Sequence, residues 1–293
     1  MDPRRAVALT GAGAAAALIG LLDGSRDRQQ LVVAAGRLGI PAPVTEQMLA
    51  LLAAAGVLID YPASLLRDMP AELRSLLRPE LAAASLARLD ADGGARVLAR
   101  RCAAAVQVCG AGRVPDGIAE VLTASGAATL RGPAPAVFSA APSARPPHPP
   151  DLTVLTGFAS PDLGDRLRRA RMPHLAVSAA EAIGIVGPLV RPGASACLRC
   201  LDLARADRDP AWPLILAQLA GRVPEPPAVD AALAAAVAAQ AAAQVLQFID
   251  QPDAAGPCES ATLELVQPGW QWRRRPWPPH AACICRAAPP PDR

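Results

Sequence analysis

The chain has 293 residues and a formal net charge of +3, and all 29 of its basic residues are arginine. It contains no lysine, so any mechanism that needs a side-chain amine is excluded. The small net charge gives no support to nucleic-acid binding, and the length predicts two domains at about 100–200 residues each.

The first 60 residues are predicted to form a small winged-helix-like unit. A short apolar run at Ala6–Leu9 predicts a leading strand, and Val57–Ile59 predicts a closing strand. Between them, glycine and proline turn signals separate three helical segments. Strand, three helices and closing strand is the element order of a winged helix. The predicted helices are Ala12–Leu22, Arg28–Leu38 and a third that opens at Thr45.

Residues 61–102 are predicted to be a helical linker. Pro62, Pro70 and Pro79 break it into short helices, because a proline removes a backbone donor and clashes with the preceding turn. A helix from Ala95 to Cys102 is expected to end the linker.

Residues 103–293 are predicted to begin with a βαβ unit of the dinucleotide-binding type. An apolar run at Ala103–Cys109 leads into Gly110-Ala-Gly112, and a helix (Asp116–Ser125) and a second strand (Gly126–Leu130) follow. Gly110 and Gly112 are the candidate cofactor-binding residues. Proline stands at position 115, where the third glycine of G-x-G-x-x-G belongs. We therefore expect a degenerate nucleotide turn, in which the fold is kept without a working phosphate site.

The rest of this region is predicted to alternate between strands and helices. The proline-rich segment Arg131–Pro150 is predicted to be a loop or a disordered connector. The predicted strands are Leu152–Leu155, His174–Val177, Ile183–Val190, Thr262–Val266 and its hairpin partner Trp270–Arg275, and the predicted helices are Asp162–Arg171 and Asp230–Ile249.

A cysteine quartet (Cys197, Cys200, Cys283 and Cys285) is the strongest chemical pattern in the chain. The first pair is spaced C-x-x-C, on a loop after a strand, and the second is spaced C-x-C. Four thiolates suit tetrahedral zinc and leave no position for water, so the pattern predicts a structural site. Two alternatives remain: His280 replaces one thiolate, or the cysteines are buried without a metal. The other cysteines, Cys102, Cys109 and Cys258, are predicted to be core residues.

Other polar residues are interpreted as structural. The charged run Arg205–Asp209 is expected to be a solvated helix end, and His174 a satisfied core or edge residue. The run Arg273–Arg275 lies close to several tryptophans, a combination that also occurs in nucleic-acid-binding surfaces. We instead expect Trp270, Trp272 and Trp277 to cover the zinc knuckle and to leave the arginines exposed.

The N-terminus shows no export cleavage pattern, so no signal peptide is predicted. The Ala-rich run Ala231–Ile249 is long enough to span a bilayer, but it contains Gln240, Gln244 and Gln247. A buried helix is the preferred interpretation, with no membrane partner and a cytoplasmic location.

Taken together, the motifs of residues 106–286 resemble the ThiF-like branch of the ubiquitin-activating superfamily. The closest resemblance is to actinobacterial ThiF-like, cyclodehydratase-associated proteins of peptide natural-product clusters. The matching segments are Val108-Cys-Gly-Ala-Gly-Arg113, Ile185-Val-Gly-Pro-Leu-Val190, Pro192-Gly193, Cys197-Leu-Arg-Cys200, Arg208-Asp-Pro-Ala-Trp212, Trp277-Pro-Pro-His280 and Cys283-Ile-Cys285. Residues 6–60, with Leu21-Leu-Asp-Gly24 and Gly56-Val-Leu-Ile59, resemble the PqqD-like winged helix that recognises precursor peptides.

The resemblance implies a fold and a chemistry that this chain matches only in part. Active members adenylate a carboxylate with ATP, using a glycine turn, an acidic ribose partner, arginine and lysine on the phosphates, and an aspartate on magnesium. Gly110 and Gly112 match. Arg131 stands in place of the acidic residue, and Thr156 and Gly157 stand where the resemblance places the aspartate. Phosphoryl chemistry depends on positioned charge, so ATP and Mg²⁺ are not expected.

These observations predict an α/β chain: a small winged-helix-like unit (1–60), a helical linker (61–102), and a shortened Rossmann-like ThiF domain with a structural zinc knuckle (103–293). The predicted function is a non-catalytic scaffold in azoline-type ribosomal peptide maturation. The expected partner is a precursor peptide or a cyclodehydratase-type protein, a homodimer is the expected assembly, and no nucleic acid is expected to bind. The alternatives are an ATP-dependent adenylyltransferase acting on a peptide or carrier-protein carboxylate, and a decayed gene product with no function.

Overall fold

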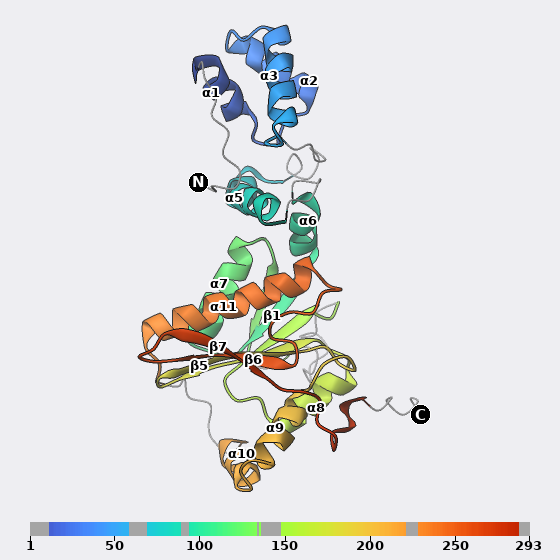
Figure 1. Cartoon of the computed structure of the whole chain (residues 1–293), viewed down its shortest axis with the longest axis vertical. Coiled ribbons are helices and arrows are strands. Elements are labelled where there is room, and N and C mark those ends of the chain that lie inside the picture. Colours follow the sequence, from blue (N-terminus) through green and yellow to red (C-terminus); the bar gives the residue numbers. More distant parts are fainter. Residues whose placement is uncertain are drawn as a thin grey trace. The chain divides into compact units, whose positions relative to one another are not determined.

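A computed structural model describes residues 12–58, 69–88, 94–133, 135, 148–220 and 228–286 (Figure 1). The chain divides into two compact units, residues 1–100 and residues 101–293. Most of the predicted proline-rich connector and the predicted leading strand at Ala6–Leu9 lie outside the described residues.

The first unit begins with three short helices that share a small apolar core. They are α1 (Ala12–Leu21), α2 (Arg28–Arg37) and α3 (Ala42–Ala54). Their common core is formed by Leu18, Leu31, Ala35, Ile40 and Leu49. A capping box at Asp27 begins α2, where the carboxylate accepts from the Gln30 amide and the Gln30 side chain returns to the Asp27 amide.

The predicted closing strand is not formed at Val57 and Leu58. The amides of both residues donate to the carbonyl of Leu52, which closes the C-terminus of α3 and leaves the two residues outside any strand. Ile59 lies outside the described residues. The three-helix part of the prediction is confirmed, and the winged-helix assignment stays a prediction.

The predicted break at Pro79 is wrong. Helix α5 (Ala71–Arg88) runs through this proline, and α6 (Ala95–Ala103) follows. Leu77 and Leu81, on either side of Pro79 in α5, are buried together with Leu98 of α6. Burial of this apolar stripe compensates for the backbone hydrogen bond that the proline removes.

The second unit is built on a seven-stranded sheet with the strand order β2-β1-β3-β4-β5-β6-β7. The first four strands in this order are parallel, and the last three are joined antiparallel. The strands are β1 (Ala105–Cys109), β2 (Ala128–Gly132), β3 (Leu152–Thr156), β4 (His174–Ala180), β5 (Ile183–Val190), β6 (Ala261–Val266) and β7 (Gln271–Pro276). The parallel half confirms the predicted βαβ opening.

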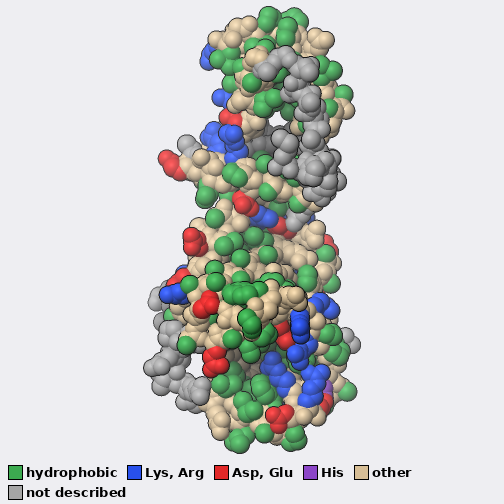
Figure 2. Space-filling model, turned by 60° about the vertical axis from the view of Figure 1, so that its left-hand side comes forward, with side chains coloured by type: hydrophobic (Ala, Val, Ile, Leu, Met, Phe, Trp, Pro, Cys, Tyr) green, Lys and Arg blue, Asp and Glu red, His purple; other side chains and the backbone are tan. Residues whose placement is uncertain are grey.

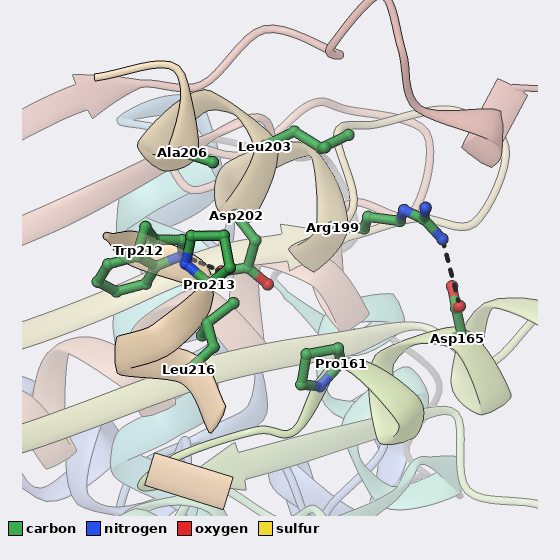
Figure 3. A pocket seen from close by; sticks show the side chains of 9 residues that line it. All are labelled: Pro161, Asp165, Arg199, Asp202, Leu203, Ala206, Trp212, Pro213 and Leu216. Atoms are coloured by element: carbon green, nitrogen blue, oxygen red, sulfur yellow. Dashed lines mark hydrogen bonds and ion pairs between the residues drawn. The ribbon is translucent and has the colours of Figure 1, made fainter. Parts of the chain in front are cut away.

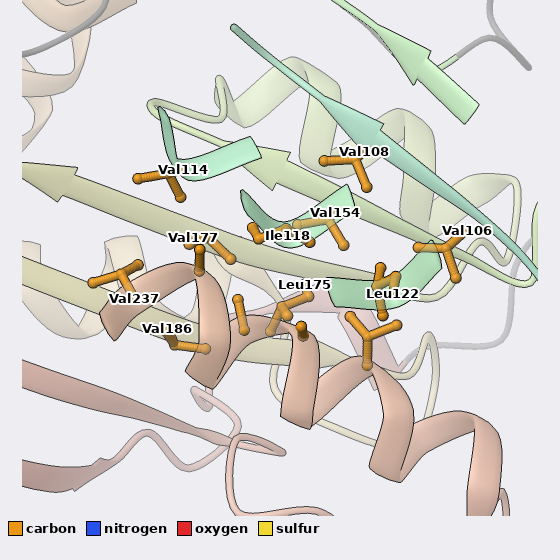
Figure 4. Packing of buried hydrophobic residues seen from close by; sticks show 14 of the residues in the cluster. Val106, Val108, Val114, Ile118, Leu122, Val154, Leu175, Val177, Val186 and Val237 are labelled. Atoms are coloured by element: carbon orange, nitrogen blue, oxygen red, sulfur yellow. The ribbon is translucent and has the colours of Figure 1, made fainter. Parts of the chain in front are cut away.

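Helices cover both faces of the sheet. They are α7 (Arg113–Ala124), α8 (Pro161–Arg169), α9 (Leu198–Ala206), α10 (Trp212–Ala220) and α11 (Ala231–Asp250), with a short 3-10 helix at Ile284–Arg286. Helices α7 and α11 pack on one face over alternate strand residues such as Val106, Val154 and Leu175 (Figure 4). On the other face, Leu167 of α8 packs on Cys109 and Leu155.

Helix α11 is long and apolar enough to cross a membrane by length and composition, with a mean hydropathy of 1.6. Half of that window is buried within the unit. Val237, Ala241 and Val245 lie in the main core. Gly184 of β5 has no side chain, and the side chain of Val237 occupies the space where a Cβ atom at position 184 would stand. The helix is therefore the core helix of this unit, as the prediction of a buried helix expects.

A row of buried polar side chains crosses the parallel strands on the face opposite α11. Gln107, Thr153 and His174 are paired in register on β1, β3 and β4, and each is buried. The Nδ1 atom of His174 lies 2.9 Å from the carbonyl oxygen of Met172. Within the described residues, His174 Nε2 and Thr153 Oγ1 have no hydrogen-bond partner. His174 is thus a core residue whose hydrogen bonding is only half satisfied.

Acid is expected to destabilise the protein through His174. Burial lowers the pKa of this imidazole to about 4. Between pH 6.5 and pH 4 the unfolded chain binds a proton that the folded chain does not, so stability falls as the pH falls. The predicted loss is about 3 kcal/mol at pH 4. Urea unfolding across this range should show a shallower pH dependence for His174→Gln than for the parent chain. The exposed His148→Gln is the matched control, and equal slopes for both variants would contradict the prediction.

Candidate functional site

The cysteine quartet comes together at the N-terminus of α9. Cys197 is the N-cap residue of that helix, and Cys200 lies in its first turn. The predicted loop around the first pair is therefore a helix start. The C-terminal segment brings Cys283 within 3.6 Å of Cys197 and Cys285 within 3.4 Å of Cys200, measured between sulfur atoms. The two sulfurs of the first pair are 3.8 Å apart.

This geometry could hold a metal ion. All four sulfur atoms lie within 4.8 Å of one another. A tetrahedral zinc ion with bonds of about 2.3 Å places its ligand sulfurs about 3.8 Å apart. The observed separations are close to that value.

The surroundings of the sulfur atoms are apolar. Cys197, Cys200 and Cys285 are buried, together with Val190 and Ala196. Burial and, to a smaller extent, the neighbouring cysteines raise the pKa of the Cys285 thiol to about 11. Burial likewise raises the pKa of Cys197. A bound divalent cation reverses this balance because it stabilises thiolates.

His280 lies outside the group of four sulfur atoms. Its Nε2 atom lies 2.8 Å from a carboxylate oxygen of Asp207, just beyond the end of α9. Its Nδ1 atom accepts a hydrogen bond from the amide of Ala282. The ring thus joins the C-terminal segment to the end of α9, and the potential metal ligands among the described residues are the four cysteines.

The glycine turn has the backbone that the motif requires. Gly110 and Gly112 have φ values of 112° and 102°, a region that favours glycine. Thr156, at the carboxyl end of β3, fills the space beside the turn. Its hydroxyl donates to the carbonyl of Cys109 at 2.6 Å and lies where a Cβ atom at position 110 would stand. The space directly beside Gly110 is therefore filled by a side chain of the protein itself.

Arg131 extends from β2 to the first turn of α7. Its guanidinium donates to the carbonyl of Pro115 at 2.8 Å and to the carboxylate of Asp116 at 2.5 Å. An acidic residue at this end of the second strand binds a ribose hydroxyl in dinucleotide sites. Here the position holds a cation that is paired within the chain. The sequence shows the substitution, but the pairing with Asp116 becomes visible only in three dimensions.

Pro115 is accommodated in the first turn of α7, as expected, and is buried. Gly117, two positions later in the chain, allows a different close contact, between α7 and α11. A Cβ atom at position 117 would stand 3.0 Å from the Cβ of Ala238 in α11.

The arginines and tryptophans near the C-terminus are arranged differently from the prediction. Trp277 is buried, and its indole donates to the hydroxyl of Thr262 at 2.9 Å. Trp270 and Trp272 remain 44% and 37% exposed, so the expected cover by these two residues is wrong. The expected exposure of Arg273–Arg275 is confirmed. Three further contacts were not predicted: the guanidiniums of Arg205, Arg208 and Arg275 lie 5.2–5.9 Å from the Trp277 ring centre.

A cavity of about 200 Å³ lies among α8, α9 and α10, and sequence reasoning missed it (Figure 3). Trp212 donates to Asp202 at 3.2 Å, and Arg199 lies 3.8 Å from Asp165 (Figure 3). Burial raises the pKa of Asp202. The remaining lining is apolar: Pro161, Leu203, Ala206, Pro213 and Leu216. Helix α10 is the missed element, because Trp212–Ala220 is apolar on every side and shows no helical periodicity.

No protein-family model matches the chain, and no curated protein matches it in sequence. Solved structures do match its fold. E. coli MccB with ATP superposes with a TM-score of 0.54 at 14% identity, covering 92% of this chain and 90% of that one. A heterocyclase in complex with substrate and cofactor gives 0.54 at 16% identity, covering 87% of this chain. The heterocyclase TruD gives 0.51 at 16% identity, covering 86%.

These likenesses concern the fold. The chain spans about a third of the two heterocyclases, 32% and 35% of their lengths, but nearly all of MccB. The mixed α/β fold with its seven-stranded sheet is therefore of the MccB and TruD type.

Proposed function

We propose that the chain is a degenerate ThiF-like protein that binds a precursor peptide or a partner enzyme in azoline-type peptide maturation without adenylating it. The observation that carries the proposal is the occupied crevice beside the glycine turn. The Thr156 hydroxyl lies against Gly110, and Arg131 pairs with Asp116 across the adjoining strand and helix. A phosphate approaching the turn meets these groups instead of open backbone.

The fold supports a role in peptide maturation. One of the matching structures is a heterocyclase solved with its substrate and cofactor. This chain has the same fold, with Thr156 and Arg131 placed beside its glycine turn. A binding role that does not use the glycine turn is compatible with both observations.

The second candidate is an ATP-dependent adenylyltransferase, favoured by the match to MccB with ATP over 90% of that chain. It requires the Thr156 and Arg131 side chains to move away from the turn, and a cation other than lysine to neutralise the phosphates.

Calorimetry separates the two functions. We expect titration of the full chain with Mg-ATP to give no heat of binding at concentrations up to about 1 mM. A dissociation constant of about 1 mM corresponds to a binding free energy of only about −4 kcal/mol. Thr156→Gly tests whether the Thr156 side chain blocks nucleotide binding, because it removes the group that fills the space beside Gly110. Micromolar binding of Mg-ATP by the parent chain would contradict the proposal and favour the adenylyltransferase.

We also propose that the cysteine quartet holds one structural zinc ion. Its support is the sulfur geometry, the apolar surroundings and a cluster that, among the described residues, contains four thiols and no further ligand group. In this role, zinc joins the C-terminal segment to the start of α9 and takes no part in chemistry.

A further inference from the structure

Strand β7 is the last strand of the sheet, and all six of its residues are exposed. Strand β6 pairs with one side of it, and no described strand pairs with the other. An edge of this kind presents unpaired backbone donors and acceptors to any extended chain that approaches it. Trp270 and Trp272 add exposed apolar surface at the same edge.

The register shows which backbone groups point outward. The amide of Trp277 donates to the carbonyl of Ser260 at 2.7 Å, and the pairing with β6 runs without a shift from there to Gln271. Hydrogen-bonded pairs alternate along an antiparallel ladder. Gln271, Arg273 and Arg275 therefore bond to β6, whereas the amides of Trp272 and Arg274 face the open side.

The edge carries several arginines, and only some of them are paired with carboxylates among the described residues. Arg275 pairs with Glu264 at 2.9 Å, and Arg274 donates to the carbonyl of Pro257. Within the described part of the chain, the guanidiniums of Arg273 and Arg208 contact no carboxylate. Figure 2 shows a band of arginine side chains on this unit with only isolated acidic side chains beside it.

Trp277 holds three arginine side chains close together beside β7. Its buried ring contacts the guanidiniums of Arg205, Arg208 and Arg275, which would otherwise repel one another. Aromatic faces stabilise such cations. The chain thus holds several arginines together at one end of an open sheet edge.

Charge at a sheet edge also serves to prevent aggregation. Trp270 and Trp272, which are 44% and 37% exposed, have the opposite effect, because their apolar surface at the same edge favours association with another chain. Nucleic acid is the less favoured occupant, since the chain has a net charge of only +3 and outward amides match a peptide backbone better than a sugar–phosphate one.

We propose that the open edge of β7 binds an extended acidic peptide as an added strand. The outward amides of Trp272 and Arg274 donate to the peptide backbone, the tryptophans contact its apolar side chains, and Arg273 and Arg208 pair with its carboxylates. Pro276 has no amide hydrogen, so the added strand ends before that residue. The inference rests on the proposed binding function and names the chemistry of the partner.

The test uses the full chain and a fluorescein-labelled peptide of alternating valine and glutamate, with fluorescence anisotropy as the readout. We expect saturable binding that weakens with added salt. The matching valine–lysine peptide and a labelled single-stranded oligonucleotide are expected not to bind. If the oligonucleotide binds and the acidic peptide does not, the proposal is wrong.

Two sets of variants locate the site. Arg208→Glu/Arg273→Glu is expected to weaken binding at least about tenfold, whereas Arg169→Glu, an exposed arginine on α8, is expected to change it little. Arg274→Pro removes one outward amide and should abolish binding, while Arg274→Ala keeps the amide and should retain most of it. Circular dichroism verifies that each variant is folded.

Peptide binding that none of these β7 variants affects would overturn the edge site but leave the proposed binding function standing. That function is judged separately by the Mg-ATP titration.

Discussion

Removing the metal from the cysteine quartet is expected to lower the thermal unfolding midpoint by about 10–20 °C, equivalent to about 5 kcal/mol or more. Two connections between the C-terminal segment and α9 depend on the metal, those of Cys283 with Cys197 and of Cys285 with Cys200. Without it, buried thiols remain next to one another with no cation between them. The loss is smaller than for an isolated zinc finger, because the sheet has a core of its own.

The measurement combines elemental analysis with differential scanning calorimetry before and after chelation in reducing buffer. Cys200→Ser is expected to reproduce the chelated midpoint and to make it insensitive to chelator. Cys102 is exposed, so its predicted place in the core is wrong. Cys102→Ser, outside the quartet, is therefore the matched control and should leave metal content and midpoint unchanged. Less than about half a zinc per chain in the parent protein would count against a structural tetrahedral site.

Local patterns predicted the strands of the sheet and the grouping of the four cysteines. Strand β5 has the predicted limits, Ile183–Val190, because an apolar run between polar residues marks both of its ends. The quartet was predicted from the close spacing within each cysteine pair, and the structure brings the two pairs together. The helix start at the first pair was not predicted. Neither inference needs knowledge of distant contacts.

The wrong predictions depend on contacts that are distant in the chain. Proline rules predict a break at Pro79, but burial of Leu77 and Leu81 against Leu98 keeps α5 continuous. The pairing of Arg131 with Asp116 joins residues of a strand and a helix, and no periodicity indicates it. The same holds for the arginines around Trp277. The sequence shows which charged and aromatic side chains are present, but only the fold determines which of them contact one another.

The ion pair between Arg101 and Asp250 is expected to be the most sensitive polar contact of the second unit. The guanidinium donates twice to the carboxylate, at 2.9 and 2.7 Å, and joins the end of α6 to the last residue of α11. The side chains are only 11% and 2% exposed. Arg101→Met removes both of these hydrogen bonds from a buried carboxylate, which is expected to cost about 3 kcal/mol or more of folding free energy.

Urea unfolding of a double-mutant cycle isolates this pair from the packing of the arginine stem. Arg101→Met and Asp250→Leu should each destabilise the protein strongly, while the double variant should recover much of the loss, because an apolar pair leaves no charge buried. Arg113→Met, at an exposed arginine at the start of α7, is the matched control and is expected to change stability by less than about 0.5 kcal/mol. Additive losses in the double variant would show that α11 is held in place by its apolar contacts with α7 and the sheet, and that the ion pair contributes through its two side chains separately.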